Sequence, residues 1–149
     1  MKLSTKHFGE LDVTDDKIIT FEEGIPGLEG TKYVLISDED PDGDVSNFFF
    51  WLQSVDVPDI ALVMIDVLKV MPDYDPLVDA EELESIGGFD PANIFVYNVA
   101  VIPENIQKLS VNLKAPVVIN DKTKKGKQVV SRNENYGVRH HIFEELNQK

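Results

Sequence analysis

The sequence contains no cysteine among its 149 residues, and histidine occurs only at His7, His140 and His141. The absence of cysteine excludes a disulfide framework, thiolate zinc sites and a cysteine nucleophile. A serine triad would need one of the three histidines beside a serine, and no segment resembles a nucleophile elbow. The adjacent side chains of His140 and His141 point apart and have no second ligand cluster, so we predict neither catalysis nor a metal site.

Long apolar runs are also missing. No run approaches the roughly 18 residues that a membrane-spanning helix needs, and residues 1–7 lack the apolar core of a signal peptide. The glycine-rich segment Glu23–Gly30 lacks the Lys-Ser or Lys-Thr ending of a phosphate-binding loop and the spacing of a dinucleotide fingerprint. We therefore expect one cytoplasmic domain over residues 1–149, with no cofactor and no membrane contact.

Positive charge is scarce in most of the chain. The 27 acidic residues outnumber the 14 lysines and arginines, which gives a net charge of −13. Residues 1–104 hold 23 of the acids and 5 of the bases, whereas residues 105–149 hold 4 acids and 9 bases. An acidic body of this size repels phosphate backbones and attracts basic proteins, so direct binding to nucleic acid is not expected. The acidic surface serves either solubility or the docking of a basic partner.

The most acidic loop, Asp38–Asp44, begins like a calcium-binding EF-hand loop, with acids at loop positions 1, 3 and 5 and glycine at 6. The match then fails, because loop position 12 is Phe49 where the motif needs a bidentate glutamate. Strands are also expected on both flanks, where an EF-hand has helices. We interpret the loop as a solvated hairpin tip.

The stretch Phe48–Asp66 combines the most aromatic and β-branched bulk and holds the only tryptophan, Trp51. It predicts two strands, Phe48–Ser54 and Ile60–Ile65, joined by an acidic connection. Both runs are apolar at nearly every residue, which favours strands covered on both faces at the centre of a β core. Trp51 is either part of this core or the cap of an exposed partner site.

Alternation and turn residues predict further strands around this centre. They are Lys2–Phe8, Glu10–Val13, Lys17–Phe21, Lys32–Ser37, Asn93–Ile102, Leu109–Asn120 and Lys127–Ser131. One short helix is predicted at Asp79–Gly87, where Asp79 is the N-cap and Gly87 follows the end. We expect this helix to cover the sheet.

Three segments are less regular. Val67–Met71 is expected to continue or bulge the second central strand. Pro116 interrupts Leu109–Asn120, which suits an edge strand or a bulge. His140–Leu146 is expected to form a last helical turn. The whole pattern predicts a mainly β fold: a single antiparallel β-barrel-like domain with one or two short helices, although the pattern does not decide between a barrel and a sandwich.

Five motifs, in this order, resemble the flagellar assembly factor FliW family over nearly the whole chain. They are Ile19–Glu29 (ITFEEGIPGLE), Phe50–Ser54 (FWLQS), Asn112–Asn120, Gly126–Val129, and the pair Tyr136 and Arg139. Each motif alone is weak evidence for the family, but five motifs in the family's order and spacing are specific to it. The chain departs from the family pattern at Leu28, where an aromatic residue is usual, and in the unusually acidic loop Asp38–Asp44.

The resemblance implies a non-enzymatic partner switch. Members of this family bind CsrA, a small basic RNA-binding dimer that represses translation of flagellin mRNA, and they also bind flagellin near its C-terminal helical end. Free flagellin takes the family member away from CsrA, so repression tightens when flagellin accumulates. The composition fits this picture at one point, because an acidic domain bound beside an RNA-binding surface disfavours the approach of phosphate.

Several residues are candidates for partner contact. They are the acids Asp38, Asp40 and Asp42 for the basic partner, the apolar Ile25, Leu28, Phe48 and Phe49 for the flagellin helix, and the motif residues Asn120 and Arg139. The motif residues Gln53 and Asn112 are interpreted instead as structural, because polar side chains between apolar strands usually form hydrogen bonds with backbone groups. An edge strand at Leu109–Asn120 is an alternative docking site.

Three other functions stay open at this level. A flagellin chaperone would bind flagellin without CsrA. A hydrolase would use a carboxylate pair in an acidic pocket, and stoichiometric binding without turnover would argue against it. An acidic decoy of nucleic acid would exclude RNA from a basic protein, whereas an allosteric antagonist would form a ternary complex with it.

Overall fold

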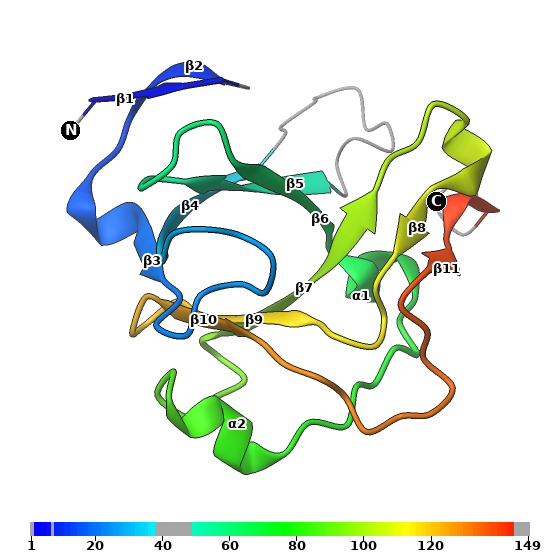
Figure 1. Cartoon of the computed structure of the whole chain (residues 1–149). Helices are drawn as coiled ribbons and strands as arrows, with labels where there is room; N and C mark the ends of the chain where they lie inside the picture. The colour runs from blue at the N-terminus through cyan, green and yellow to red at the C-terminus, as the bar shows by residue number, and fades with distance from the viewer. Residues whose placement is uncertain (1, 7, 38–48, 145–149) are drawn as a thin grey trace.

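The computed structural model describes residues 2–6, 8–37 and 49–144 (Figure 1). Within them the chain forms eleven strands and two short α-helices. The strands are β1 (Lys2–Thr5), β2 (Gly9–Asp12), β3 (Ile18–Thr20), β4 (Lys32–Ser37), β5 (Phe49–Ser54), β6 (Ala61–Ile65), β7 (Ile94–Val101), β8 (Ser110–Val111), β9 (Val117–Asn120), β10 (Lys125–Gln128) and β11 (His140–His141). The helices are α1 (Val67–Val70) and α2 (Ala80–Glu84). No helix in these ranges is long and apolar enough to cross a membrane.

Seven strands close into a barrel in the order β7-β6-β5-β4-β3-β10-β9. The ring closes because β9 pairs with β10 on one side and with β7 on the other. Neighbouring strands are antiparallel, except that β3 and β10 run parallel. The prediction of a mainly β, barrel-like fold is confirmed, and a sandwich is excluded because the sheet returns to its own first strand.

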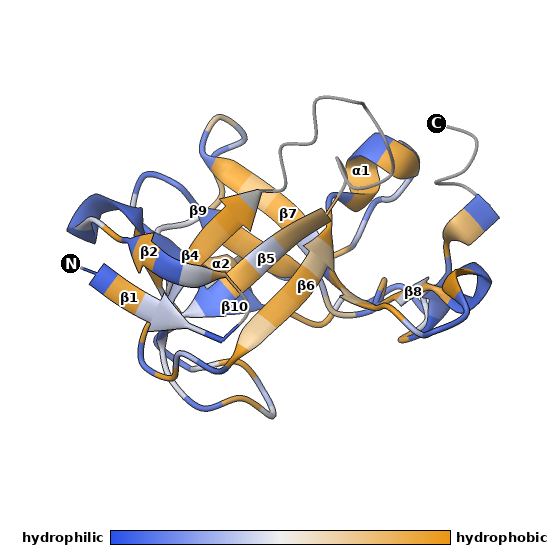
Figure 2. Ribbon diagram, turned by 90° about the horizontal axis from the view of Figure 1, so that it is seen from above, coloured by the Kyte–Doolittle hydropathy of each residue, from blue (hydrophilic) through white to orange (hydrophobic). Residues whose placement is uncertain are grey.

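Strands β4, β6 and β7 consist largely of hydrophobic residues (Figure 2), and buried side chains from the strands form a hydrophobic cluster that fills the barrel. Tyr33, Leu52 and Met64, from three successive strands, are fully buried there. The two predicted central strands are confirmed as the antiparallel pair β5 and β6. Their outer face is covered less completely than expected, because Trp51 and Val63 are only half-buried.

Three structures cover the outside of the barrel. The β1–β2 hairpin buries Leu3 against Val34 of β4. Helix α2, predicted from the sequence as a cover, buries Leu83 against Val118 of β9. Asp79 occupies the N-cap position of α2, as predicted, but its side chain makes no cap hydrogen bond. Its carboxylate instead pairs with Arg132, with Nε and Oδ1 3.1 Å apart.

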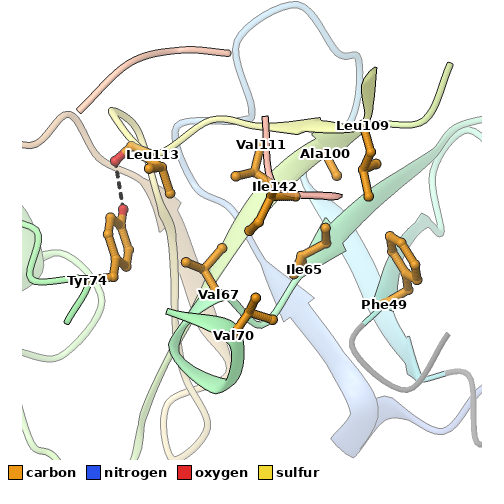
Figure 3. Close-up of a cluster of buried hydrophobic side chains, with 10 residues drawn as sticks. All are labelled: Phe49, Ile65, Val67, Val70, Tyr74, Ala100, Leu109, Val111, Leu113 and Ile142. Atoms are coloured by element: carbon orange, nitrogen blue, oxygen red, sulfur yellow. Dashed lines mark hydrogen bonds between the residues drawn. The ribbon is translucent and has the colours of Figure 1, made fainter. Parts of the chain in front are cut away.

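The third cover consists of α1, β8 and the segment around Ile142 (Figure 3). The prediction that Val67–Met71 continues β6 as a strand is wrong, because the chain turns into α1 there. Val67 and Val70 are three residues apart, which places them on one face of a helix. Both side chains are buried in this outer cluster, together with Ile65 at the end of β6. Burial of this pair favours the helical turn over an extended strand.

The prediction of one long strand over Leu109–Asn120 is also wrong. The chain forms β8, leaves the sheet, and returns as β9 directly after Pro116. Between the strands, Asn112 Oδ1 accepts a hydrogen bond from the backbone N–H of Ala115, at 3.0 Å. Because β9 lies between β7 and β10, it is not an edge strand and offers no docking edge. The strand predicted at Lys127–Ser131 is present as β10, two to three residues earlier at Lys125–Gln128, and forms an antiparallel hairpin with β9.

The C-terminal prediction is partly wrong. His140 and His141 form β11, which pairs with Val111 and Ser110 of β8, rather than starting a helical turn. The residues at 143 and 144 are helical, and the rest of the predicted turn lies outside the described residues. The edge pairing of β11 brings Ile142 over the outer cluster, where it is fully buried.

Candidate partner-binding surface

The apolar residues that the sequence nominated for partner contact lie largely inside the molecule. Ile25 is only 3% exposed and Phe49 only 7% exposed, and Leu28 is half-buried against the barrel core. The loop between β3 and β4 folds across the barrel opening (Figure 1), with the Leu28 N–H donating to the Ile25 carbonyl at 2.9 Å. This fold turns Ile25 into the barrel core, whereas Phe49 of β5 is buried in the cluster that α1 and β8 cover. Both are therefore core residues rather than exposed contacts for a partner.

The polar motif residues divide between structure and surface. Asn120 is 3% exposed, and its Oδ1 accepts hydrogen bonds from the backbone N–H groups of Lys122 and Thr123, at 3.0 and 3.2 Å. It therefore shapes the β9–β10 turn rather than a binding face. Arg139 is exposed, as a partner contact requires. The remaining candidates, Asp38, Asp40, Asp42 and Phe48, lie outside the described residues.

Gln53 has the bonding of a structural residue. Its Nε2 donates to the carbonyls of Ser54 and Pro58, both at 2.9 Å, which ties the β5–β6 connection to the end of β5. The side chain is fully buried. These contacts agree with the structural role predicted for Gln53. The hydrogen bond from the Ala115 N–H to Asn112 likewise agrees with the structural role predicted for Asn112.

An apolar groove of about 560 Å³ lies between α1 and α2. Its floor is the outer face of the barrel, formed by Ile94 and Val96 of β7 and Val118 of β9. Leu68 of α1 forms one wall and Leu83 of α2 another. The groove exists because α1 and α2 cover different parts of the barrel and leave this strip between them.

Large apolar side chains remain exposed at the groove. Phe89, after α2, is 65% exposed, and Leu68 is 42% exposed. Leu77, beside the lining residues Pro76 and Val78, is 52% exposed. Apolar side chains gathered around a groove mark a binding surface, whereas isolated exposed ones need no explanation.

The segments that form the groove are strongly acidic. Residues 66–90 contain eight acids and one base. Three of the acids are partly neutralised, because Asp66 pairs with Lys69, Asp79 pairs with Arg132 and Glu82 pairs with Lys127. The carboxylates of Asp73, Asp75, Glu81, Glu84 and Asp90 belong to exposed residues of the same segment. The groove is therefore an apolar strip bordered by negative charge.

Burial perturbs two titratable groups beside the groove. Desolvation raises the pKa of the Asp66 carboxyl, and the Lys69 ammonium, 3.8 Å away, opposes the shift in part. Burial also raises the pKa of the Tyr74 hydroxyl to about 12. This hydroxyl donates to the Leu113 carbonyl at 2.7 Å and accepts from Asn98 Nδ2 at 3.0 Å. Tyr74 is therefore a neutral, fixed part of the groove wall.

The α2 wall is attached to the barrel by polar contacts as well as by burial. Thr123 Oγ1 donates to the carbonyl of Ile86 at 2.7 Å. Lys127 Nζ lies 2.9 Å from Glu82 Oε2 and 3.0 Å from Glu23 Oε2, and hydrogen bonds to both carboxylates raise the pKa of Lys127. The groove is thus bounded by elements that are held in place, which favours a preformed site.

Among the described residues, no three His, Asp or Glu side chains are grouped closely enough to hold a metal ion. The sequence reasoning did not identify the groove, because its floor and walls come from residues that are up to 50 positions apart. One signal was available: Leu77 and Phe89 are large apolar residues within an acidic, turn-rich stretch, where no strand or helix was expected to bury them.

Comparison with known proteins agrees with this fold. The family model of the FliW protein matches residues 2–142. A flagellar assembly factor FliW of Alkaliphilus metalliredigens is 41% identical over 147 residues, which cover 98% of this chain and 88% of that protein. A flagellar assembly factor FliW of Thermoanaerobacter pseudethanolicus is 40% identical over 147 residues, covering 98% and 95%.

A solved structure agrees as well. The crystal structure of a flagellar assembly factor FliW superposes with a TM-score of 0.84 at 33% sequence identity, covering 96% of this chain and 97% of that one. The family model matches nearly the whole chain, relatives of similar length are about 40% identical to it, and a solved member shares its fold. The chain therefore belongs to the FliW family.

Proposed function

We propose that this flagellar assembly factor is a non-enzymatic partner switch, which binds CsrA, antagonises the binding of CsrA to flagellin mRNA, and releases CsrA when flagellin binds. The observation that carries the proposal is the apolar groove bordered by acids between α1 and α2. The groove supports binding of both partners: flagellin would use its apolar floor, and CsrA would use its acidic border.

The apolar floor suits flagellin. An amphipathic helix binds by laying its apolar face into a hydrophobic groove. Ile94, Val96 and Val118 supply such a floor, and Phe89 stands exposed beside it as an aromatic anchor. Exposed aromatic residues at the centre of an interface contribute much of its binding energy. The C-terminal helical end of flagellin is the expected occupant.

The acidic border suits CsrA. Eight acids and one base in residues 66–90 give a field that attracts a basic protein and speeds its association. Once bound, the same charges disfavour the approach of RNA phosphates to CsrA, even where the RNA site itself is not covered. Because both partners use one surface, flagellin and CsrA exclude each other.

Calorimetric titration of the protein into CsrA, with and without bound flagellin, tests the proposal. We expect CsrA binding that weakens as salt rises and is lost when flagellin is present. In the variant Phe89→Ser, affinity for both partners should fall about tenfold, which is the effect of losing one aromatic contact. Phe89 is exposed, so the substitution leaves the fold intact.

The variant Val138→Ser is the matched control. Val138 is 62% exposed, close to the 65% of Phe89, and does not line the groove. It should bind both partners normally. Flagellin binding without any CsrA binding would reduce the function to that of a flagellin chaperone. Unchanged affinity of Phe89→Ser for both partners would remove the groove from the proposal.

A further inference from the structure

The two ends of the barrel differ. At one end, the loop between β3 and β4 crosses the opening (Figure 1) and buries Ile25 in the barrel core. At the opposite end, β3 and β7 begin and β4 and β9 end. A hollow of about 260 Å³ opens there, lined by residues of these four strands and of the turn between β9 and β10.

The inner part of the hollow is apolar. Ile19, Tyr97 and Ile119 belong to the buried barrel core, and Leu35 packs against it. Phe95, near the start of β7, forms the outer part and is 47% exposed. The hollow shares no lining residue with the groove between α1 and α2, which lies on the outside of the barrel. The two are separate sites.

Tyr97 brings an unpaired polar group to the hollow. Its side chain is only 6% exposed, yet its hydroxyl makes no hydrogen bond in the part of the chain that the structure describes. The other two buried tyrosines, Tyr33 and Tyr74, each donate to a backbone carbonyl. Burial, with smaller contributions from the carboxylates of Asp66 and Asp121, raises the pKa of Tyr97 to about 12, so its hydroxyl is a neutral donor. Buried donors of this kind normally have an acceptor.

Lys124, at the rim, has a backbone conformation that suits glycine. Its φ of 57° is the only positive value at a non-glycine residue in the described ranges, and glycine adopts it without strain. The Lys124 N–H donates to the Asn120 carbonyl, and the Thr20 N–H donates to the Lys124 carbonyl, both at 2.9 Å. A long side chain at such a strained position indicates that the side chain has a use.

The other charged residues of the rim are Lys17, just before β3, and Asp121. Asp121 Oδ1 lies 2.6 Å from Lys124 Nζ, whereas Lys17 makes no ion pair with any residue that the structure describes. Asp16, beside Lys17 in the sequence, is exposed and does not line the hollow. The lining residues therefore carry one positive charge in excess, in a chain whose net charge is −13. This local excess favours an anion.

We propose that this end of the barrel binds a small aromatic carboxylate. Its ring packs beside Phe95, because aromatic rings contact one another favourably. Its carboxylate accepts a hydrogen bond from the Tyr97 hydroxyl and pairs with the ammonium groups of Lys17 and Lys124. A hollow of about 260 Å³ is smaller than the roughly 300–1,000 Å³ of sites for drug-sized ligands, which limits the occupant to a small molecule. This binding does not depend on the partner switch.

Equilibrium dialysis with cinnamate as the probe tests the proposal. Cinnamyl alcohol and cinnamylamine have the same ring and chain, with a neutral and a positive head group. We expect saturable binding of one cinnamate per chain and at least about tenfold weaker binding of the other two compounds. Equal binding of the three compounds, or no saturable binding of cinnamate at millimolar concentration, would overturn the proposal.

Two variants separate a role in binding from a role in folding. Tyr97→Phe and Lys124→Gly should each weaken cinnamate binding about tenfold. Neither should lower stability in urea, because the Tyr97 hydroxyl has no partner among the described residues and glycine relieves the strain at position 124. Lys122→Gln is the control for charge, because Lys122 is exposed in the same turn and does not line the hollow. It should bind cinnamate within about twofold of wild type.

A second pair of variants locates the probe. Phe95→Ser should weaken cinnamate binding about tenfold, whereas Phe89→Ser, an exposed aromatic residue of the groove, should not. Loss of binding in Phe89→Ser alone would place the probe in the groove and overturn the proposal. A Tyr97→Phe variant that is less stable but binds cinnamate normally would also overturn it, because the hydroxyl would then serve the fold.

Discussion

Gly126 of β10 lies directly against the ring of Phe21: a β-carbon at position 126 would stand 2.5 Å from Phe21 Cζ. Phe21 is fully buried in the barrel core and follows β3, which pairs with β10 at Thr20 and Lys125. The absence of a side chain at position 126 therefore allows the parallel pairing of β3 and β10 around a large aromatic ring.

Gly126→Ala should accordingly lower the free energy of unfolding by about 1–3 kcal/mol, the usual cost of overpacking a core. Gly137→Ala is the control, because the nearest atom to a β-carbon there, the backbone N of Arg139, is 4.0 Å away. Urea unfolding of the two variants and the wild type measures both effects. Equal stability of the two variants would show that the core yields to the extra methyl group.

Tyr74→Phe should destabilise the protein by about 1–3 kcal/mol. The buried hydroxyl donates to Leu113 O and accepts from Asn98 Nδ2, and its removal leaves both groups without this partner. Tyr136→Phe is the comparison, because its hydroxyl accepts from the N–H of Asp75 in an exposed setting. Thermal unfolding should rank Tyr74→Phe as clearly less stable than Tyr136→Phe, and the reverse order would contradict the role assigned to Tyr74.

Asp56 should stabilise the fold in a pH-dependent way. Its Oδ2 accepts hydrogen bonds from the N–H groups of Thr31 and Lys32, at 2.8 and 3.1 Å, and these bonds hold the pKa of the Asp56 carboxyl below 3.8. A carboxyl with a lowered folded-state pKa contributes stability above its unfolded pKa, and this contribution is lost as pH falls through the folded pKa.

Asp56→Asn should therefore lower stability by up to about 1 kcal/mol at pH 7, and the difference from wild type should shrink as pH falls below 3.8. Denaturant unfolding at several pH values measures this difference. Asp59→Asn, in the same exposed β5–β6 connection, controls for the loss of one negative charge. A difference between Asp56→Asn and wild type that does not change with pH would assign the effect to packing instead.

Lys127 should contribute more to stability than Lys125. The Lys127 ammonium joins Glu23 of the β3–β4 loop to Glu82 of α2 and is 18% exposed, whereas Lys125 pairs with Glu22 alone and is 40% exposed. We expect Lys127→Met to cost about 0.5–1 kcal/mol and Lys125→Met less, because exposed pairs contribute little. High salt should reduce the difference between the two variants, as measured by unfolding in urea with and without sodium chloride.

The sequence predicted the strands well where the signal was local. β4, β5, β6 and β7 are runs of apolar and β-branched residues, and the structure places each of them within a residue or so of its predicted range. Val67–Met71 was predicted wrongly because its apolar residues suit either a strand or a helical turn, and only the outer cluster that receives Val67 and Val70 favours the helix. Leu109–Asn120 was predicted wrongly as one strand, because the sequence does not show that β8 and β9 pair with different strands.

The candidate site was harder to predict than the fold. Ile25 and Phe49 looked suitable for a partner because they are large and apolar, but the same property draws a side chain into the core when the fold offers space there. The groove depends on where α1 and α2 come to lie on the barrel. Its residues are adjacent only after β7 and β9 have paired.

The sequence by itself determined the mainly β fold, the acidic character and the family resemblance, because these depend on composition, on local alternation and on motifs in a fixed order. Only the tertiary structure decided that the sheet closes on itself and that α1 and α2 leave a groove between them. These features depend on contacts between residues far apart in the chain, which are fixed by packing and strand pairing rather than by local preference.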